Sequence, residues 1–367
     1  MSLEIEVQLI AVLVAAACAL PGVFLVLRRM AMLSDAISHT VLLGIVLGYL
    51  ITRDLASPLL FIGAAATGVL TVSLVELLNR TGLVKEDAAI GLIFPVLFSI
   101  AVILISRYTG NVHLDIDRVL LGELAFAPFD RLTIAGLDLP RALVVGAVVL
   151  LLNLLLLGLF YKELKLATFD AGLAAALGFA PTLIHYGLMS VVSITAVSAF
   201  DAVGSILVIA LMVGPPAIAY LLTDRLAMML LLSVAIGALS AIGGYWLAYW
   251  LNVSIAGAMA SVVGALFLIA YLLAPERGLL AIGVRRERQR WEFAQQMLTL
   301  HLLNHEGSDT ALTESTSDHL TTDMRWSPAF AAAVLRRAEQ AGLVQQHDKL
   351  LLLTDRGRRV AQEASLR

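Results

Sequence analysis

The chain has 367 residues, of which 60% are hydrophobic and only 14% are charged, and its mean hydropathy is +0.90. These values exclude an ordinary soluble domain and indicate a membrane protein. The formal net charge is −3, but residues 1–275 hold 12 Lys and Arg against 16 Asp and Glu, whereas residues 276–367 hold 13 against 12. This change in composition predicts two domains, a transmembrane domain over residues 1–280 and a smaller one over residues 285–367.

Apolar stretches long enough to span a bilayer follow one another along the first domain. A transmembrane helix needs about 20 predominantly apolar residues. Nine such stretches cover roughly residues 6–27, 30–51, 57–78, 90–106, 141–160, 182–199, 203–222, 226–250 and 254–274. The predicted fold class is therefore an all-α polytopic membrane protein with about nine transmembrane helices and a small additional domain.

Basic residues between the spans predict the orientation of the chain. If Arg28 and Arg29 are cytoplasmic, most of the other basic loops are cytoplasmic too, as the positive-inside rule requires. The N-terminus is then outside and the C-terminus is cytoplasmic. The longest external segment, residues 107–140, and the internal segment 161–181 are predicted docking surfaces.

The second span contains a carboxylate and an imidazole at helical spacing. Asp35 and His39 lie four residues apart, so both side chains project from one face of the helix. Oxygen and imidazole nitrogen together suit Mn²⁺, Fe²⁺ or Zn²⁺ better than Ca²⁺ or Mg²⁺. Charged groups within a membrane are functional candidates. We therefore interpret the pair as part of a metal path; the alternative is an internal hydrogen bond that locks two helices.

Other polar or helix-breaking residues inside the spans leave alternatives open. Asp201 is either a metal ligand at the outer mouth or a turn residue between two spans. Gly214-Pro215-Pro216 predicts either an interrupted transporter helix or a simple kink. Glu76 and His185 lie near predicted span ends, where anchoring to lipid headgroups is favoured over metal binding.

The chain carries no nucleotide-binding motif of its own. None of its four lysines follows a glycine, which excludes the Walker A pattern. We therefore predict that this chain is not an enzyme and that any ATP hydrolysis comes from a partner subunit.

The segment from Leu27 to His39, with its basic pair followed by S-D-A-x-S-H, resembles the manganese/zinc/iron permease family of ABC importers. Three later stretches are similar to the same family: Glu86 to Gly91, Phe169 to Gly178, and Val203-Gly204 with Pro215 to Ala219. The likeness covers about residues 7–275. The residues around 200–204 and 216–221 look more like the manganese branch than the zinc branch.

This resemblance implies partners and site residues. A family permease pairs with a second permease chain, binds ATP-binding cassette subunits on the inside and receives metal from an extracytoplasmic binding lipoprotein. Asp35 and His39 match the family's metal-path residues. The family's ATPase-coupling element is matched by Phe169, Asp170, Ala174 and Gly178.

The C-terminal domain departs from typical members of the family. A helix through Trp291 and Leu302, a helix after Ser327-Pro328, a hairpin over residues 343–353 and a last helix after Thr354 resemble the winged-helix domain of iron- and manganese-dependent repressors. Because residues 276–367 hold 13 basic against 12 acidic residues, we favour a regulatory or assembly role over DNA binding.

The sequence thus predicts the permease subunit of an ATP-driven importer in the bacterial inner membrane, with Mn²⁺ favoured over Zn²⁺ or Fe²⁺ as substrate and no resident cofactor. Two alternatives remain open: a proton-coupled secondary metal carrier, and a membrane-tethered, metal-responsive transcription regulator.

Overall fold

The computed structural model describes residues 2–54, 57–108, 124–134, 137–306, 316, 320, 324–347 and 350–365. The chain divides into two compact units, Met1–Gly278 and Leu279–Arg367.

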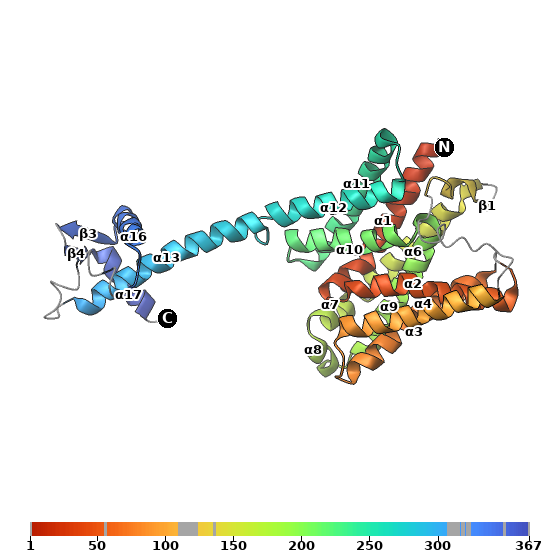
Figure 1. Cartoon of the computed structure of the whole chain (residues 1–367), viewed down its shortest axis with the longest axis horizontal. Coiled ribbons are helices and arrows are strands. Elements are labelled where there is room, and N and C mark those ends of the chain that lie inside the picture. The colour runs from red at the N-terminus through yellow and green to blue at the C-terminus, as the bar shows by residue number, and fades with distance from the viewer. Residues whose placement is uncertain are drawn as a thin grey trace. The chain divides into compact units, whose positions relative to one another are not determined.

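The first unit is a helix bundle (Figure 1). Within the described residues, nine of its helices are long and apolar enough to cross a membrane, which confirms the predicted number. They are α1 (Leu3–Leu27), α2 (Ala31–Thr52), α3 (Pro58–Arg80), α4 (Glu86–Tyr108), α6 (Arg141–Leu159), α9 (Pro181–Val203), α10 (Ser205–Leu222), α11 (Leu226–Leu251) and α12 (Ile255–Leu273).

Helix α1 forms the centre of this bundle. Its many alanine and valine side chains are buried, and it packs against α6, α9, α10 and α11. Gly22 makes the contact with α10 especially close, because a Cβ atom there would lie 1.9 Å from the carbonyl oxygen of Met212. Small residues at such contacts allow two backbones to approach in lipid, where packing rather than the hydrophobic effect holds helices together.

Helices α2 and α3 are joined by the same kind of contact. A Cβ atom at Gly44 would lie 2.1 Å from the carbonyl oxygen of Gly63, so neither position accommodates a larger residue without separating the helices. One turn earlier, the hydroxyls of Thr40 and Thr71 lie 2.7 Å apart and are fully buried. The face of α2 that carries Thr40 and Gly44 is thereby fixed against α3.

Two short turns connect consecutive helices of the bundle. Between α1 and α2, the amide of Met30 donates to the carbonyl of Leu25, and Arg29 adopts a left-handed conformation (φ 62°), as in a Schellman motif. Between α9 and α10, Gly204 (φ 77°) makes the turn. Helix α10 continues through Pro215 and Pro216, so the interrupted helix considered for this segment is absent.

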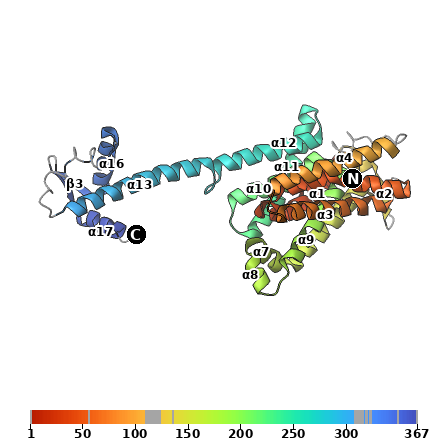
Figure 2. The same cartoon turned by 60° about the horizontal axis from the view of Figure 1, so that its bottom comes forward.

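Shorter elements lie at the two ends of the bundle. A 3-10 turn, η1 (Ala127–Phe129), and an antiparallel hairpin of β1 (Arg131–Ile134) and β2 (Leu137–Pro140) precede α6. Helices α7 (Tyr161–Phe169) and α8 (Ala171–Ala176) lie between α6 and α9. The hairpin lies at the end that holds the N-terminus, and α7 and α8 lie at the other end (Figures 1 and 2). The all-α prediction missed this hairpin, although Leu-Thr-Ile and Leu-Asp-Leu flank a two-residue Ala-Gly connection in the sequence.

The second unit contains α13 (Leu279–His305), α16 (Pro328–Gln340), β3 (Val344–His347), β4 (Leu350–Leu353) and α17 (Asp355–Ser365). The Ser327 hydroxyl accepts a hydrogen bond from the Phe330 amide and caps α16, as predicted. Strands β3 and β4 pair antiparallel, which confirms the predicted hairpin. Leu298, Leu320, Val334 and Leu343 are among the residues of a core separate from that of the first unit.

Candidate functional site

The carboxylate of Asp35 and the imidazole of His39 meet on one face of α2. His39 Nε2 lies 3.3 Å from Asp35 Oδ1, and the side chains are 28% and 47% exposed, respectively. The contact lies within one helix, so it does not lock two helices together. This face differs from the one that packs on α3 through Thr40 and Gly44, because about 100° of rotation separates His39 from Thr40.

Aromatic rings of α4 surround the imidazole. The His39 ring centroid lies 5.4 Å from that of Phe94 and 6.1 Å from that of Phe98. These rings restrict the orientation of His39 and leave the carboxylate of Asp35 as its polar neighbour. An exposed oxygen and nitrogen at this spacing can bind one divalent transition-metal ion.

Among the described residues, no third His, Cys, Asp or Glu side chain is placed to bind a metal ion together with this pair. Two donors leave the remaining coordination positions of a metal ion to water or to another chain.

The predicted outer-mouth residues lie partly outside what the structure describes. Asp201 belongs to the last turn of α9, three residues before the turn at Gly204, but its side chain is not among those described. The prediction that Asp201 binds metal is therefore untested. Residues 109–123, which belong to the external segment predicted as a docking surface, also lie outside the described residues.

The residues of the predicted coupling element lie on two short helices, α7 and α8, and at their ends. Asp170 separates α7 from α8, and its carboxylate caps α8 by accepting a hydrogen bond of 2.8 Å from the Leu173 amide. Gly178 (φ 86°) ends α8, with the Phe179 amide donating to the Ala174 carbonyl. Asp170 and Gly178 therefore define where this short helix begins and ends.

Side chains of this element divide into buried and exposed sets. Ala174, a residue of α8, is fully buried. Phe169, Leu173 and Leu177 are 59%, 47% and 61% exposed. We refer to these three apolar side chains as the α8 ridge. An exposed apolar ridge on a loop between spans is a feature of a protein-docking surface.

Two residues predicted to anchor separately in lipid headgroups contact each other. His185 Nε2 of α9 lies 3.7 Å from Glu76 Oε2 of α3, and Glu76 also pairs with Arg80. Arg28 reaches the same cluster. No local sequence pattern indicates these contacts, because they join helices that are far apart along the chain.

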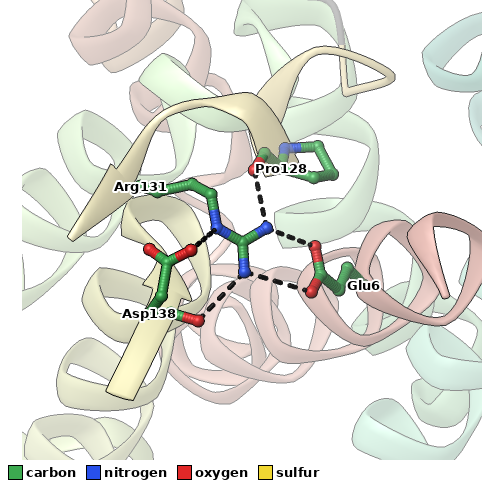
Figure 3. Close-up of polar contacts among 4 residues, drawn as sticks. All are labelled: Glu6, Pro128, Arg131 and Asp138. Carbon is green, nitrogen blue, oxygen red and sulfur yellow. Dashed lines mark hydrogen bonds and ion pairs between the residues drawn. The ribbon is translucent and has the colours of Figure 1, made fainter. Parts of the chain in front are cut away.

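At the opposite end of the bundle, Arg131 of the hairpin binds the N-terminal turn of α1 (Figure 3). Its guanidinium donates to both carboxylate oxygens of Glu6, at 3.1 and 3.4 Å, and to Asp138 Oδ2 at 2.7 Å. Glu6 is only 5% exposed. The hydrogen bond to Glu6, with a further contribution from Asp138, raises the pKa of Arg131. The charged pair fixes the hairpin to the helix that forms the centre of the bundle.

Comparison with known proteins identifies relatives over most of the chain. It is 51% identical over 360 residues to the zinc transport system membrane protein TroD of Treponema pallidum, covering 98% of each chain. It is 52% identical over 286 residues to the manganese transport system membrane protein MntD of Bacillus subtilis, covering 78% of this chain and 97% of MntD. The similarity to TroD thus includes the C-terminal unit.

A solved structure and a family profile agree with these relatives. The fold is similar to a chain in the structure of PsaBC from Streptococcus pneumoniae in complex with Fab, with a TM-score of 0.65, 28% identity, and coverage of 77% of this chain and 96% of that chain. The profile of the ABC 3 transport family matches residues 3–274, which include the nine helices of the described residues that are long and apolar enough to span the membrane. The chain belongs to the ABC 3 transport family.

Proposed function

We propose that this chain is the membrane-spanning permease subunit of an ATP-driven importer for a divalent transition metal, with Mn²⁺ favoured over Zn²⁺ or Fe²⁺. The observation that carries this proposal is the partly exposed Asp35–His39 pair on a membrane-spanning helix. Relatives named for zinc and for manganese transport are almost equally similar to the chain. The preference for Mn²⁺ rests on the residues around 200–204 and 216–221.

The proposal includes an orientation and a set of partners. The N-terminus and the β1–β2 hairpin face outward, where an extracytoplasmic metal-binding lipoprotein docks. The α8 ridge faces the cytoplasm of a bacterial cell, where ATP-binding cassette subunits dock. A second permease chain, identical or homologous, completes the pathway beside the exposed face of α2.

In this arrangement the two donors of α2 give the ion a temporary site in the membrane. The Asp35 carboxylate offsets part of the positive charge of the ion, and the neutral imidazole of His39 donates its electron pair to it. Phe94 and Phe98 keep the imidazole beside the carboxylate. Release of the ion then requires a movement that separates the two donors or exposes them again. The partner ATPase drives this movement.

The test is uptake by the reconstituted complex. Proteoliposomes containing the permease pair, its ATPase and the binding lipoprotein should take up Mn²⁺ only when ATP is present, and a protonophore should leave the rate unchanged. The purified permease chain alone should hydrolyse no ATP. Uptake driven by a proton gradient without ATP would instead establish a secondary carrier, and competition among Mn²⁺, Zn²⁺ and Fe²⁺ would identify the substrate.

We propose that the C-terminal unit is a winged-helix module that regulates the importer. Three observations support a role other than DNA binding. Its charge is nearly balanced, and Arg337, a candidate for phosphate contact, packs over the Trp291 ring at 3.9 Å from the centroid. The exposed N-terminal half of α16 presents Pro328, Ala329 and Ala332, which cannot donate hydrogen bonds to base edges from their side chains.

Truncation after Val284 tests this role. The truncated permease should transport metal at the rate of the full chain at low internal metal, but should no longer slow as internal metal rises, because every residue assigned to translocation precedes the cut. Uptake is measured against internal metal loading for both proteins. Identical inhibition curves would refute regulation, and loss of assembly would make the unit structural. Tight, sequence-selective DNA binding by the full-length protein at physiological salt would support the tethered regulator instead.

A further inference from the structure

Arg28, at the corner between α1 and α2, contacts both chain segments that flank α8. Its Nε donates to the Thr168 hydroxyl at 3.2 Å, and Thr168 lies two residues before the Asp170 cap of α8. Its Nη1 lies 3.2 Å from His185 Nδ1, in the first turns of α9, after α8 has ended at Gly178. One guanidinium therefore bridges the segment that enters α8 and the helix that leaves it.

The corner that carries Arg28 is too short to absorb movement. Only Arg28, Arg29 and Met30 separate α1 from α2, and the Schellman hydrogen bonds hold all three. Asp35 is the fifth residue of α2, about 6 Å along the helix from its start. A helix transmits an axial displacement or rotation over so short a distance as a rigid body, so a pull on Arg28 moves Asp35 and His39 together.

A third helix is tied to the same point. His185 also faces Glu76 of α3, and Glu76 pairs with Arg80. Helix α3 in turn packs closely against α2. One cluster of side chains therefore joins the α8 segment to α3, to α9 and to the corner between α1 and α2; it consists of Arg28, Thr168, His185, Glu76 and Arg80. We refer to it as the Arg28 cluster.

The charges in this cluster exclude a second cation site. Two guanidinium groups face one carboxylate, so the net charge opposes binding of a divalent cation. Burial lowers the pKa of Arg28 from its usual value, because it removes part of the hydration of the charged guanidinium. The Nη2 of Arg28 is buried and has no hydrogen-bond partner among the described residues. This N–H group is therefore free to donate a hydrogen bond when the helices are arranged differently.

We propose that Arg28 is a positioning residue that transmits movement of the α8 segment to the metal-binding face of α2. The inference rests on the proposed function of the chain as a permease driven by a partner ATPase. In this proposal the ATPase shifts α8, and the shift reaches Arg28 through its contacts with Thr168 and His185. Arg28 then displaces the first turns of α2. Arg28 touches neither the metal nor the ATPase.

The experiment compares Arg28→Gln and Thr168→Val with Arg29→Asn in the complete complex in proteoliposomes. Thr168→Val keeps the shape of the side chain and removes only the hydroxyl that accepts from Arg28. Arg29→Asn removes one positive charge from the same corner, and asparagine tolerates the left-handed conformation there. Uptake of ⁵⁴Mn²⁺ and release of phosphate are measured in the same vesicles, together with copurification of the ATPase and Mn²⁺ binding.

We expect Mn²⁺ taken up per ATP hydrolysed to fall at least tenfold in Arg28→Gln and severalfold in Thr168→Val, with copurification and Mn²⁺ binding retained. Arg28→Lys should restore part of the ratio, because an ammonium cannot reproduce the fork that bonds both partners. Arg29→Asn should match the wild type. An unchanged ratio in Thr168→Val and Arg28→Gln would overturn the proposal, as would an equal loss in Arg29→Asn. Failure of the wild-type complex to import metal with ATP would instead refute the proposed function.

Discussion

Metal uptake should fall to background when Asp35 or His39 is replaced by alanine, although the permease still assembles with its ATPase. The two side chains meet at 3.3 Å and are the described donors of the proposed site, so each substitution leaves only one. Even residues that merely support a metal ligand change affinity by about 10–100-fold when mutated, and we expect loss of a ligand itself to reduce uptake by at least about 100-fold. Uptake is measured by ⁵⁴Mn²⁺ accumulation in proteoliposomes.

Two further substitutions separate ligand chemistry from packing. Asp35→Asn keeps the size of the side chain but removes its charge, and it should lose uptake as alanine does. Ser38→Ala is the matched control on the same helix, because its buried hydroxyl donates to the Ser34 carbonyl within α2 and does not reach the pair. Near-normal uptake by a correctly inserted Asp35→Ala or His39→Ala variant would refute the site.

Copurification of the ATPase should be lost in the double variant Asp170→Arg, Gly178→Trp. Asp170→Arg removes the cap of α8, which typically contributes about 1 kcal/mol to a helix. Gly178→Trp forces a bulky residue into a left-handed conformation, at about 1–2 kcal/mol. A Cβ atom at Gly178 meets nothing within 4 Å among the described residues, so the indole would project from the end of α8 into the docking surface.

A milder substitution tests the α8 ridge without changing the ends of α8. Phe169→Ser replaces an exposed ring that neither caps nor ends α8, and it should weaken copurification while leaving the thermal stability of the permease unchanged. Lys162→Ala, at an exposed position of α7, is the control and should retain the ATPase. Retained copurification and coupled transport in the double variant would show that α8 is not the docking element.

Local patterns in the sequence were sufficient for the number of spans and for the Asp35–His39 contact. Spans follow from the length of apolar stretches, since a bilayer of fixed thickness sets the length of helix that it accepts. The contact between Asp35 and His39 follows from the geometry of one helix, in which residues four apart are neighbours. The Ser327 cap and the β3–β4 hairpin are local in the same sense, and the structure has both where they were predicted.

At two places the sequence pattern allowed two local outcomes. Phe169, Leu173 and Leu177 have the spacing of one continuous helix, yet the structure ends α7 at Phe169, because the Asp170 carboxylate accepts from the Leu173 amide and starts a new helix. Pro215 and Pro216 suggested an interruption, yet α10 continues through them. Neighbouring helices in a membrane can satisfy the backbone groups that proline frees.

Only the tertiary structure decided which distant residues act together. Arg28 contacts Thr168 and His185, which follow it by 140 and 157 residues, and Arg131 binds Glu6 across 125 residues. No helical or strand period relates such positions, and each residue alone reads as a basic group beside a span. Their partners are set by the order in which nine helices pack, which depends on close contacts such as Gly44 with Gly63 and Gly22 with Met212. The sequence by itself therefore determined the spans and the Asp35–His39 contact, whereas the packing of the helices determined how the proposed coupling segment connects to that pair.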